Sequence, residues 1–195
     1  EEYQDIFGMI QNQTERLSHL SEVLLDMTGI QSVERSDFIS LAELTDEVCC
    51  DLASIADQKK VELIQEEGDC TVTGSYLLLY RAVYNLVENA IKYNHSGGKV
   101  TVKISQKKDL PAAHSKPTDY ALVEVTDTGI GISPEFQEKI FDPFFRVDKS
   151  RSRAMGGAGL GLALVNEIAR QHGGQVKVLA SSENGSTIAL ILPLS

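Results

Sequence analysis

The chain has 195 residues, which is enough for one large core, or for one domain with an appendage. Its composition, with 42% hydrophobic and 6% aromatic residues, is that of a globular, soluble protein. Its formal net charge of −10 argues against general binding to nucleic acid or to an anionic membrane. Three cysteines without CxxC spacing favour reduced thiols in the cytoplasm over a disulfide framework or a zinc site.

An apolar stripe runs along residues 3–30 with the 3-4 spacing of a coiled coil or helical bundle. The stripe consists of Tyr3, Ile6, Ile10, Leu17, Leu20, Leu24 and Met27. We interpret residues 1–35 as a bundle helix that pairs between subunits; the alternative is an amphipathic helix packed on its own domain. The sequence begins inside this helix, and its apolar runs are too short to cross a bilayer. We therefore expect a cytoplasmic piece of a longer protein, which is anchored in the membrane through segments outside this chain.

Residues 40–94 predict two helices and two short strands between them. Ser40 and Glu43 form a capping box, which opens a helix over residues 41–60. Strands are expected at 61–67 and 70–74, with a turn at Gly68-Asp69. Ser75 is the candidate cap of a second helix, which reaches residue 94.

The remaining pattern completes a sheet. Alternating residues at 99–105 and 121–127 predict two paired strands, and a helix is expected at 160–172, closing at Gly173-Gly174. Two further strands are expected at 175–181 and 186–194. Because hairpin-like pairs replace strict alternation, residues 36–195 predict an α+β domain. We expect a two-layer sandwich of a mixed, mainly antiparallel sheet with helices on one face.

The second helix carries a polar row. Asn85, Asn89 and Lys92 fall at i, i+4 and i+7 and so share one face, beside an apolar flank. An amide oxygen can ligate Mg²⁺, which takes few protein oxygens alongside the phosphates of a substrate. The alternative is an ordinary solvated helix face.

Two glycine-containing segments follow. The strand at 121–127 delivers Asp127 to its end, and Gly129 and Gly131 permit a tight turn there. That carboxylate could accept the exocyclic amine of adenine, or it could cap its own loop as an Asx-turn. The run GGAGLGL at 156–162 opens a helix, as phosphate-binding loops do. Its spacing fits neither a P-loop, because Leu162 stands where the lysine would be, nor a dinucleotide fingerprint. Between the two segments, the phenylalanines of FDPFFRV are either a minor core or the hinge of a mobile cover.

Four segments occur in a specific order: NLVENAIKY, DTGIG, FDPFFR and GGAGLGL. In order and spacing they resemble the N, G1, F and G2 boxes of the sensor histidine kinases of two-component systems. That catalytic domain has the Bergerat ATP-binding fold, which it shares with DNA gyrase, the mismatch-repair MutL proteins and the heat-shock chaperone ATPases. The resemblance covers residues from about 36 to the end, and the helix before them resembles the second helix of the kinase dimerisation bundle.

The resemblance implies roles for individual residues. Asn89 would ligate Mg²⁺, Lys92 would meet phosphate, and Tyr93 would contact adenine. Asp127 would bond the adenine amine, with Thr187 supporting it through water. The other residues of the implied ATP site shape the pocket, complete it or enclose the phosphates: Gly129, Gly131, Ile132, Arg146, Arg151, Gly157, Gly159, Leu160, Gly161 and Leu162.

Asn85 bears on the reaction. In the hydrolysing relatives that turn of the helix carries a glutamate that activates water, and an asparagine cannot be a general base at neutral pH. The resemblance therefore implies transfer of the γ-phosphate of Mg-ATP to a histidine, with Asn85, Glu88 and Arg146 as the catalytic set. Glu88 either positions the acceptor or is solvated.

The chain departs from the family in lacking the phosphoacceptor box. His19, His95, His114 and His172 all lack its context, so we expect the acceptor on a first bundle helix outside this chain. The implied partners are ATP, Mg²⁺, a response regulator receiver domain that receives the phosphate, and a second copy through the N-terminal helix. The alternatives are a non-catalytic module that acts by dimerising and a Bergerat-fold ATPase with steady turnover.

Overall fold

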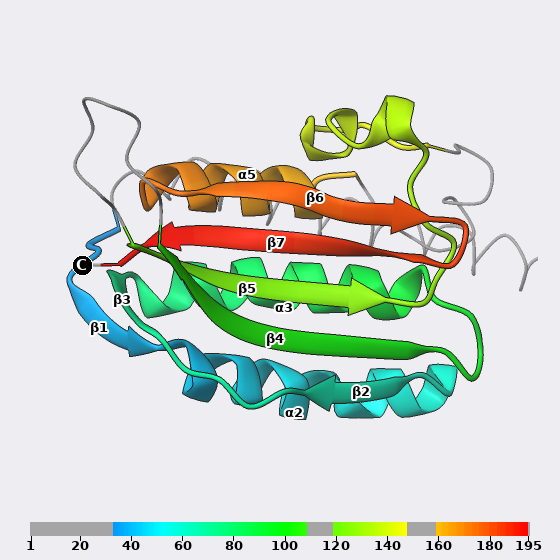
Figure 1. The fold of residues 1–195 in the computed structure, drawn as a ribbon, viewed down its shortest axis with the longest axis horizontal. Coiled ribbons are helices and arrows are strands. Elements are labelled where there is room, and N and C mark those ends of the chain that lie inside the picture. Colours follow the sequence, from blue (N-terminus) through cyan, green and yellow to red (C-terminus); the bar gives the residue numbers. More distant parts are fainter. Residues whose placement is uncertain (1–32, 109–118, 148–158, 195) are drawn as a thin grey trace, which may run out of the picture.

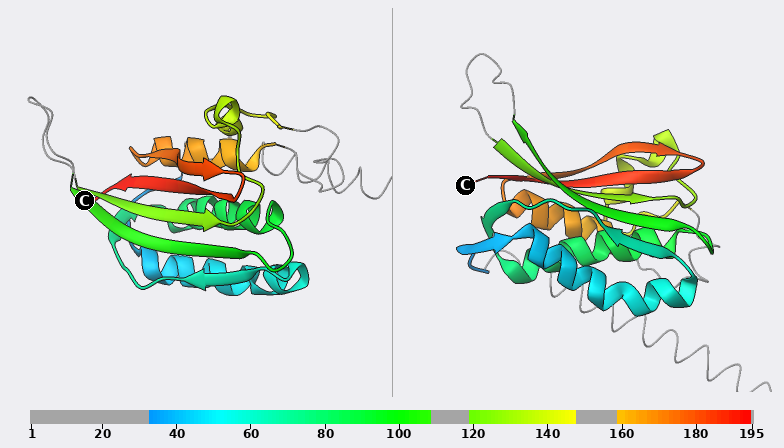
Figure 2. Two further views of the ribbon diagram at one scale, coloured as in Figure 1. Left: turned by 45° about the vertical axis from the view of Figure 1, so that its right-hand side comes forward. Right: turned by 60° about the horizontal axis from the view of Figure 1, so that its bottom comes forward.

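Five strands form one mixed sheet, and the helices of the described residues pack against one of its faces (Figures 1 and 2). The computed structural model describes residues 33–108, 119–147 and 159–194. The helices are α2 (Leu41–Lys59), α3 (Tyr76–Lys92) and α5 (Gly161–Gln171). The strands are β1 (Asp37–Ser40), β2 (Glu62–Gln65), β3 (Thr71–Gly74), β4 (Lys99–Lys108), β5 (Asp119–Asp127), β6 (Gln175–Ser182) and β7 (Gly185–Pro193). Two 3-10 turns, η2 (Pro134–Phe136) and η3 (Lys139–Phe141), lie between β5 and α5.

The sheet has the order β2-β4-β5-β7-β6, in which β2 runs parallel to β4 and every other neighbouring pair is antiparallel. This confirms the predicted α+β sandwich with a mixed, mainly antiparallel sheet. The strands on either side of Gly68-Asp69 were expected from the sequence, but they do not pair with each other. Instead, β3 pairs with β1, a strand that the sequence analysis did not predict, in a separate two-stranded sheet.

The helix ends test the predicted caps. The Glu43 N–H donates to Ser40 Oγ at 3.2 Å, which confirms the first cap, and α2 ends where Lys60 adopts a left-handed φ of 57°. Ser75 occupies the N-cap position of α3 as predicted, but its side chain makes no capping hydrogen bond. There the Tyr76 N–H donates to Asp37 Oδ2 at 3.3 Å, so a residue of β1 does the capping.

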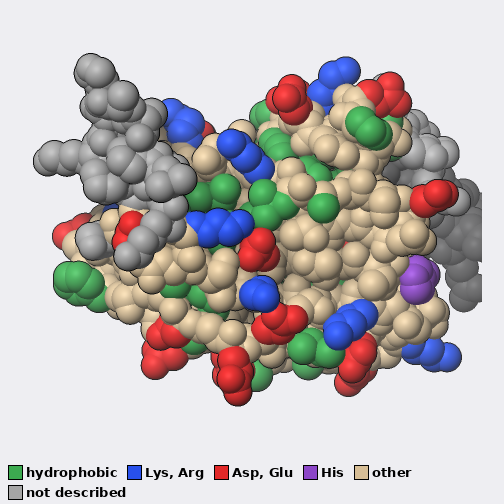
Figure 3. Space-filling view, in the orientation of Figure 1, with side chains coloured by type: hydrophobic (Ala, Val, Ile, Leu, Met, Phe, Trp, Pro, Cys, Tyr) green, Lys and Arg blue, Asp and Glu red, His purple; other side chains and the backbone are tan. Residues whose placement is uncertain are grey.

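The core lies between the sheet and the helices. Fully buried leucines of α2 and α3, such as Leu44, Leu52 and Leu79, meet the strand residues that point toward the helices, such as Val102 and Val123. Alternation along the strands sends the other residues to the open face of the sheet. Figure 3 shows that face with charged and hydrophobic side chains intermixed. No helix in the described part of the chain is long and apolar enough to cross a membrane.

Candidate functional site

One end of the sandwich gathers the segments that the sequence analysis singled out. The C-terminal end of β5, the C-terminal half of α3, the start of α5 and the β6–β7 turn all lie at the end drawn on the right in Figure 1. Arg151 and Gly157 lie outside the described residues. The structure describes the other predicted site residues, and of these Thr187 lies on the open face of the sheet.

The polar row of α3 faces the first residue of α5. Asn85 Nδ2 donates to the Arg81 carbonyl at 2.8 Å, while a Cβ on Gly161 would lie only 2.5 Å from Asn85 Oδ1 and 3.7 Å from Asn89 Nδ2. Only a glycine lets the two helices approach this closely. The two asparagines therefore lie directly beneath the N-terminus of α5, as their shared helix face predicts.

Lys92, the last member of this row, has a second cation, Arg146, nearby. Burial lowers the pKa of the Lys92 ammonium, Glu88 opposes that shift, and the nearby guanidinium of Arg146 lowers the pKa further. Arg146 Nη2 is buried and has no hydrogen-bond partner among the described residues. Buried donors in folded proteins are nearly always satisfied, so a cationic donor left open beside a second cation fits an anion.

The start of α5 provides further donors. Leu160 occupies the N-cap position without a side-chain capping bond, so its own side chain leaves the first N–H groups of the helix open. The glycine run is joined to the phenylalanine segment, because the Phe144 N–H donates to the Gly159 carbonyl at 2.9 Å. Phe141 is buried in the core, whereas Phe144 is exposed, so this segment serves in part as core. An uncapped helix N-terminus beside two cations suits phosphate groups.

Asp127 ends β5 at the other side of the site. Burial raises the pKa of its carboxyl, and the backbone N–H groups of Gly129 and Ser186 partly offset that rise. The Gly129 N–H donates to Oδ1 at 2.7 Å, so the Asx-turn considered from the sequence is present. A carboxylate has about four acceptor positions, so these backbone bonds leave capacity for a further donor such as an amine.

The C-terminal end of α3 is hydrogen-bonded to the glycine turn that follows β5. The Ile130 N–H donates to the Tyr93 carbonyl at 3.3 Å, which brings the predicted adenine contact next to the glycine turn. Thr128 Oγ1 donates to Asn94 Oδ1 at 3.2 Å, and Asn94 Nδ2 donates to the Lys99 carbonyl at 2.9 Å. Asn94 is only 7% exposed, and the sequence analysis missed it. Its place directly after the NLVENAIKY segment was the available signal.

The geometry agrees with comparisons with known proteins. A family model described as histidine kinase-, DNA gyrase B-, and HSP90-like ATPase matches residues 74–195. The chain belongs to this family.

The chain is similar to several sensor histidine kinases. The sensor-like histidine kinase SenX3 of Mycobacterium bovis is 35% identical over 182 residues, which cover 91% of this chain and 42% of SenX3. The solved structure of the mycobacterial sensor histidine kinase MprB is 28% identical, with a TM-score of 0.63, covering 81% of this chain and 97% of MprB. Histidine kinase ThkA, solved in complex with the response regulator protein TrrA, shares the fold. Its TM-score is 0.68 at 24% identity, covering 93% of this chain and 49% of ThkA. The chain thus spans about two fifths of the length of SenX3.

ATP is the nucleotide of this ATPase family.

Thr187 is a predicted ATP-site residue whose expected role the structure contradicts. Residues paired across neighbouring strands share a face, and Thr187 pairs with Thr126, with their hydroxyl oxygens 3.0 Å apart on the open face. Asp127 pairs instead with Ser186, which is 5% exposed and faces the helices. The prediction that Thr187 supports Asp127 is therefore wrong. The neighbouring residue, Ser186, lies beside Asp127 instead.

The two described histidines, His172 and His95, interact with backbone groups of the domain. His172 Nε2 accepts a hydrogen bond from the Ser75 N–H at 3.1 Å, and its Nδ1 lies 2.8 Å from the Ile168 carbonyl. His95 is exposed in the turn after α3, with Nδ1 3.3 Å from the Ser96 carbonyl. His19 and His114 lie outside the described residues, and the absence of a phosphoacceptor histidine from this chain stays a prediction.

Proposed function

We propose that this domain binds Mg-ATP and transfers its γ-phosphoryl group to a histidine on a helical bundle. The observation that carries the proposal is the buried, unpartnered Nη2 of Arg146 beside Lys92, close to the uncapped start of α5. Cations and helix N–H groups aimed at one volume stabilise the charge that spreads over a phosphoryl group in transfer.

The metal would be held by few protein ligands. The described residues contain no cluster of three His, Cys, Asp or Glu side chains suited to a metal. The side-chain amides of Asn89 and Asn85 lie where α3 meets α5. Their oxygens are suitable ligands for Mg²⁺, which takes one or two protein oxygens together with substrate phosphates. The ion would neutralise phosphate charge, while the asparagines hold it in place.

The position of Asn85 favours transfer over hydrolysis. An amide cannot remove a proton from water at neutral pH, and its Nδ2 is already engaged with the Arg81 carbonyl. Glu88 is half-buried on α3 and attracts Lys92, which supports a role in arranging charge at this end of the helix. An imidazole acceptor needs no strong base, because its free nitrogen is already nucleophilic at neutral pH.

The relatives support one of the proposed partners. ThkA is solved with a response regulator, which supports a receiver domain as the final phosphate acceptor. Residues 1–32, which carry the predicted dimerisation stripe, lie outside the described part, so the boundary near residue 35 and the homodimer stay predictions. Membrane anchoring of a longer protein stays a prediction too.

Calorimetric titration with a non-hydrolysable ATP analogue, with and without Mg²⁺, tests the site. We expect saturable binding, and about 10- to 100-fold weaker binding in Arg146→Ala, because that variant loses charge-assisted hydrogen bonds. Asn89→Ala should weaken binding only when Mg²⁺ is present. Arg170→Ala is the matched control, since this exposed arginine of α5 pairs with Glu167 at 2.8 Å.

Radiolabelled ATP then tests the reaction. The chain should label a separately supplied dimerisation bundle that carries the acceptor histidine, and it should release little inorganic phosphate without that bundle. Steady hydrolysis without transfer would support the ATPase alternative. No nucleotide binding by the wild-type chain would support the non-catalytic module.

A further inference from the structure

We propose that Ser181 of β6 is a positioning residue for adenine recognition, because its hydroxyl closes a ring of contacts that holds the Asp127 carboxylate. The inference rests on the proposed function, since it assumes that Asp127 accepts the amine of adenine. Ser181 is far from the four sequence segments that identify the family, and it reaches the site only through the β6–β7 pairing.

The first link joins Ser181 to the glycine turn. The Ile132 N–H donates to Ser181 Oγ at 2.7 Å, which fastens the end of the turn to β6. Gly131, just before it, has a φ of +68°, and a Cβ there would lie 1.7 Å from the Ser182 carbonyl oxygen. The turn therefore rests directly on β6, and Ser181 supplies the side chain that holds it there.

The second link joins Ser181 to the strand beside Asp127. Ser181 Oγ lies 2.9 Å from Ser186 Oγ and 3.4 Å from the Gly185 carbonyl. A hydroxyl has one proton, and Ser181 already accepts from Ile132, so its own proton goes to one of these two oxygens. The shorter distance favours Ser186. The Ser186 proton is then left available on the face of the sheet where Asp127 lies.

The strand pairing closes the ring. Ser186 pairs with Asp127, and its backbone N–H helps to stabilise the ionised carboxylate. On the other side, the Gly129 N–H holds Oδ1 at 2.7 Å, and the turn leads back to Ile132 and Ser181. One hydroxyl thus fixes both the turn and the strand that orient the carboxylate, so its loss loosens both sides at once.

A comparison of two nucleotides separates positioning from simple stability. Binding of ATP and of purine riboside triphosphate, which lacks the 6-amino group, is measured by calorimetry for each variant at a temperature where all are folded. The ratio of the two dissociation constants reports the bond between the amine and Asp127. We expect Ser181→Ala to reduce the wild-type preference for ATP by about 3- to 10-fold, the size of one ordinary hydrogen bond. Ser181→Thr, which keeps the hydroxyl, should restore it.

Controls make the outcomes distinct. Ser105→Ala removes a strand serine whose hydroxyl donates to Glu124 on the open face at 3.1 Å, and it should leave the ratio unchanged. If Ser181→Ala weakens both nucleotides equally, or neither, the inference is overturned while the proposed function stands. If the wild-type chain binds neither nucleotide, the proposed function itself fails.

Discussion

Asp127 shows a conflict between stability and function at a single residue. Its carboxyl is half-buried, and burial raises its pKa, so keeping it ionised at neutral pH costs free energy in the folded state. The bond from the Gly129 N–H offsets only part of this cost. A side chain held in the charged form at such a cost is typical of a binding residue.

Asp127→Asn should separate the two effects. A folded-state pKa above the unfolded value means that the folded state binds the proton more tightly, so this group favours folding most at low pH. That contribution declines as the pH rises through the unfolded and then the folded pKa. The neutral amide removes the cost, so the variant should unfold at an equal or higher temperature at pH 7, while ATP affinity falls at least about 10-fold.

Thermal unfolding and calorimetric titration measure these two quantities. Asp119→Asn is the control, since it changes a carboxylate at the opposite end of β5, whose Oδ2 lies 3.5 Å from Gln106 Nε2. A destabilised Asp127→Asn variant with unchanged ATP affinity would contradict this interpretation and favour a purely structural Asx-turn.

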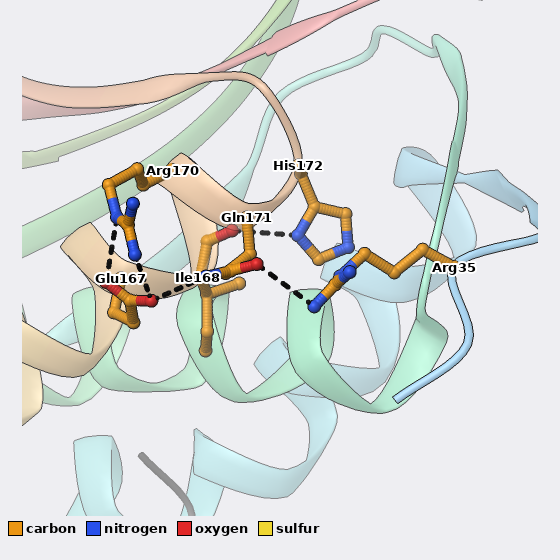
Figure 4. A network of polar contacts seen from close by, with 6 residues as sticks. All are labelled: Arg35, Glu167, Ile168, Arg170, Gln171 and His172. Atoms are coloured by element: carbon orange, nitrogen blue, oxygen red, sulfur yellow. Dashed lines mark hydrogen bonds and ion pairs between the residues drawn. The ribbon is translucent and has the colours of Figure 1, made fainter. Parts of the chain in front are cut away.

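At the scale of elements, α3 and α5 form an antiparallel pair that is joined at both ends. Near the proposed nucleotide site, Gly161 lets the start of α5 approach Asn85. At the far end, His172 accepts from the Ser75 N–H at the start of α3, and Arg35 Nη2 donates to Gln171 at 3.2 Å (Figure 4). These two helices carry the proposed phosphate and metal contacts. They are therefore held together in part by His172, which lies at the opposite end of the pair from those contacts.

This histidine makes the domain sensitive to pH. Burial lowers the pKa of His172 in the folded state, and the charge of Arg35 lowers it further, while the bond to the Ile168 carbonyl opposes both. The unfolded chain takes up the proton near the ordinary value of 6.5, before the folded chain does. The contribution of His172 to stability is thus complete above that pH and is lost as the pH falls from 6.5 through the lowered folded pKa.

Chemical denaturation at pH 7.5, 6.5 and 5.5 tests this prediction. The free energy of unfolding of the wild type should fall across the series, and His172→Gln should flatten the fall, because the amide accepts from Ser75 without titrating. His95→Gln, at an exposed turn position, should keep the wild-type slope. Identical slopes for all three proteins would show that His172 is not the titrating group.

At the scale of the whole molecule, one continuous core supports a site confined to one end. Within the described residues, the core connects α2, α3 and α5 to the sheet, and the segment before β1 enters at the opposite end from the proposed site (Figure 1). A shared core makes unfolding a single transition, because no part of the sandwich can lose its packing alone.

Leu79→Ala should therefore destabilise the whole domain. Leu79 is fully buried, and such truncations cost about 2–5 kcal/mol, while Leu77→Ala on the same helix removes a side chain that is 54% exposed and should cost much less. Denaturation followed by circular dichroism and by nucleotide binding should give coincident transitions in both variants. Separate transitions would indicate two independently folding parts.

Much of the fold and site followed from local pattern. Periodicity predicted α2, α3, α5 and the strands of the main sheet, because the burial of one face repeats within each element. Asn85, Asn89 and Asp127 were found because helix spacing and a strand end are visible in a few consecutive residues. The sequence analysis missed contacts that join distant segments: Ser75 holds the N-cap position of α3, but the side-chain bond to the Tyr76 N–H comes from Asp37.

The sequence by itself determined the α+β class, the four ordered segments and the family to which they point, since each depends on residues close together in the chain. Only the tertiary structure decided that β3 pairs with β1, that Ser186 and not Thr187 lies beside Asp127, and that Ser181 reaches the glycine turn. The reason is that strand register has a period of two. A pairing across distant segments decides which face each residue occupies, and a shift of one residue reverses it.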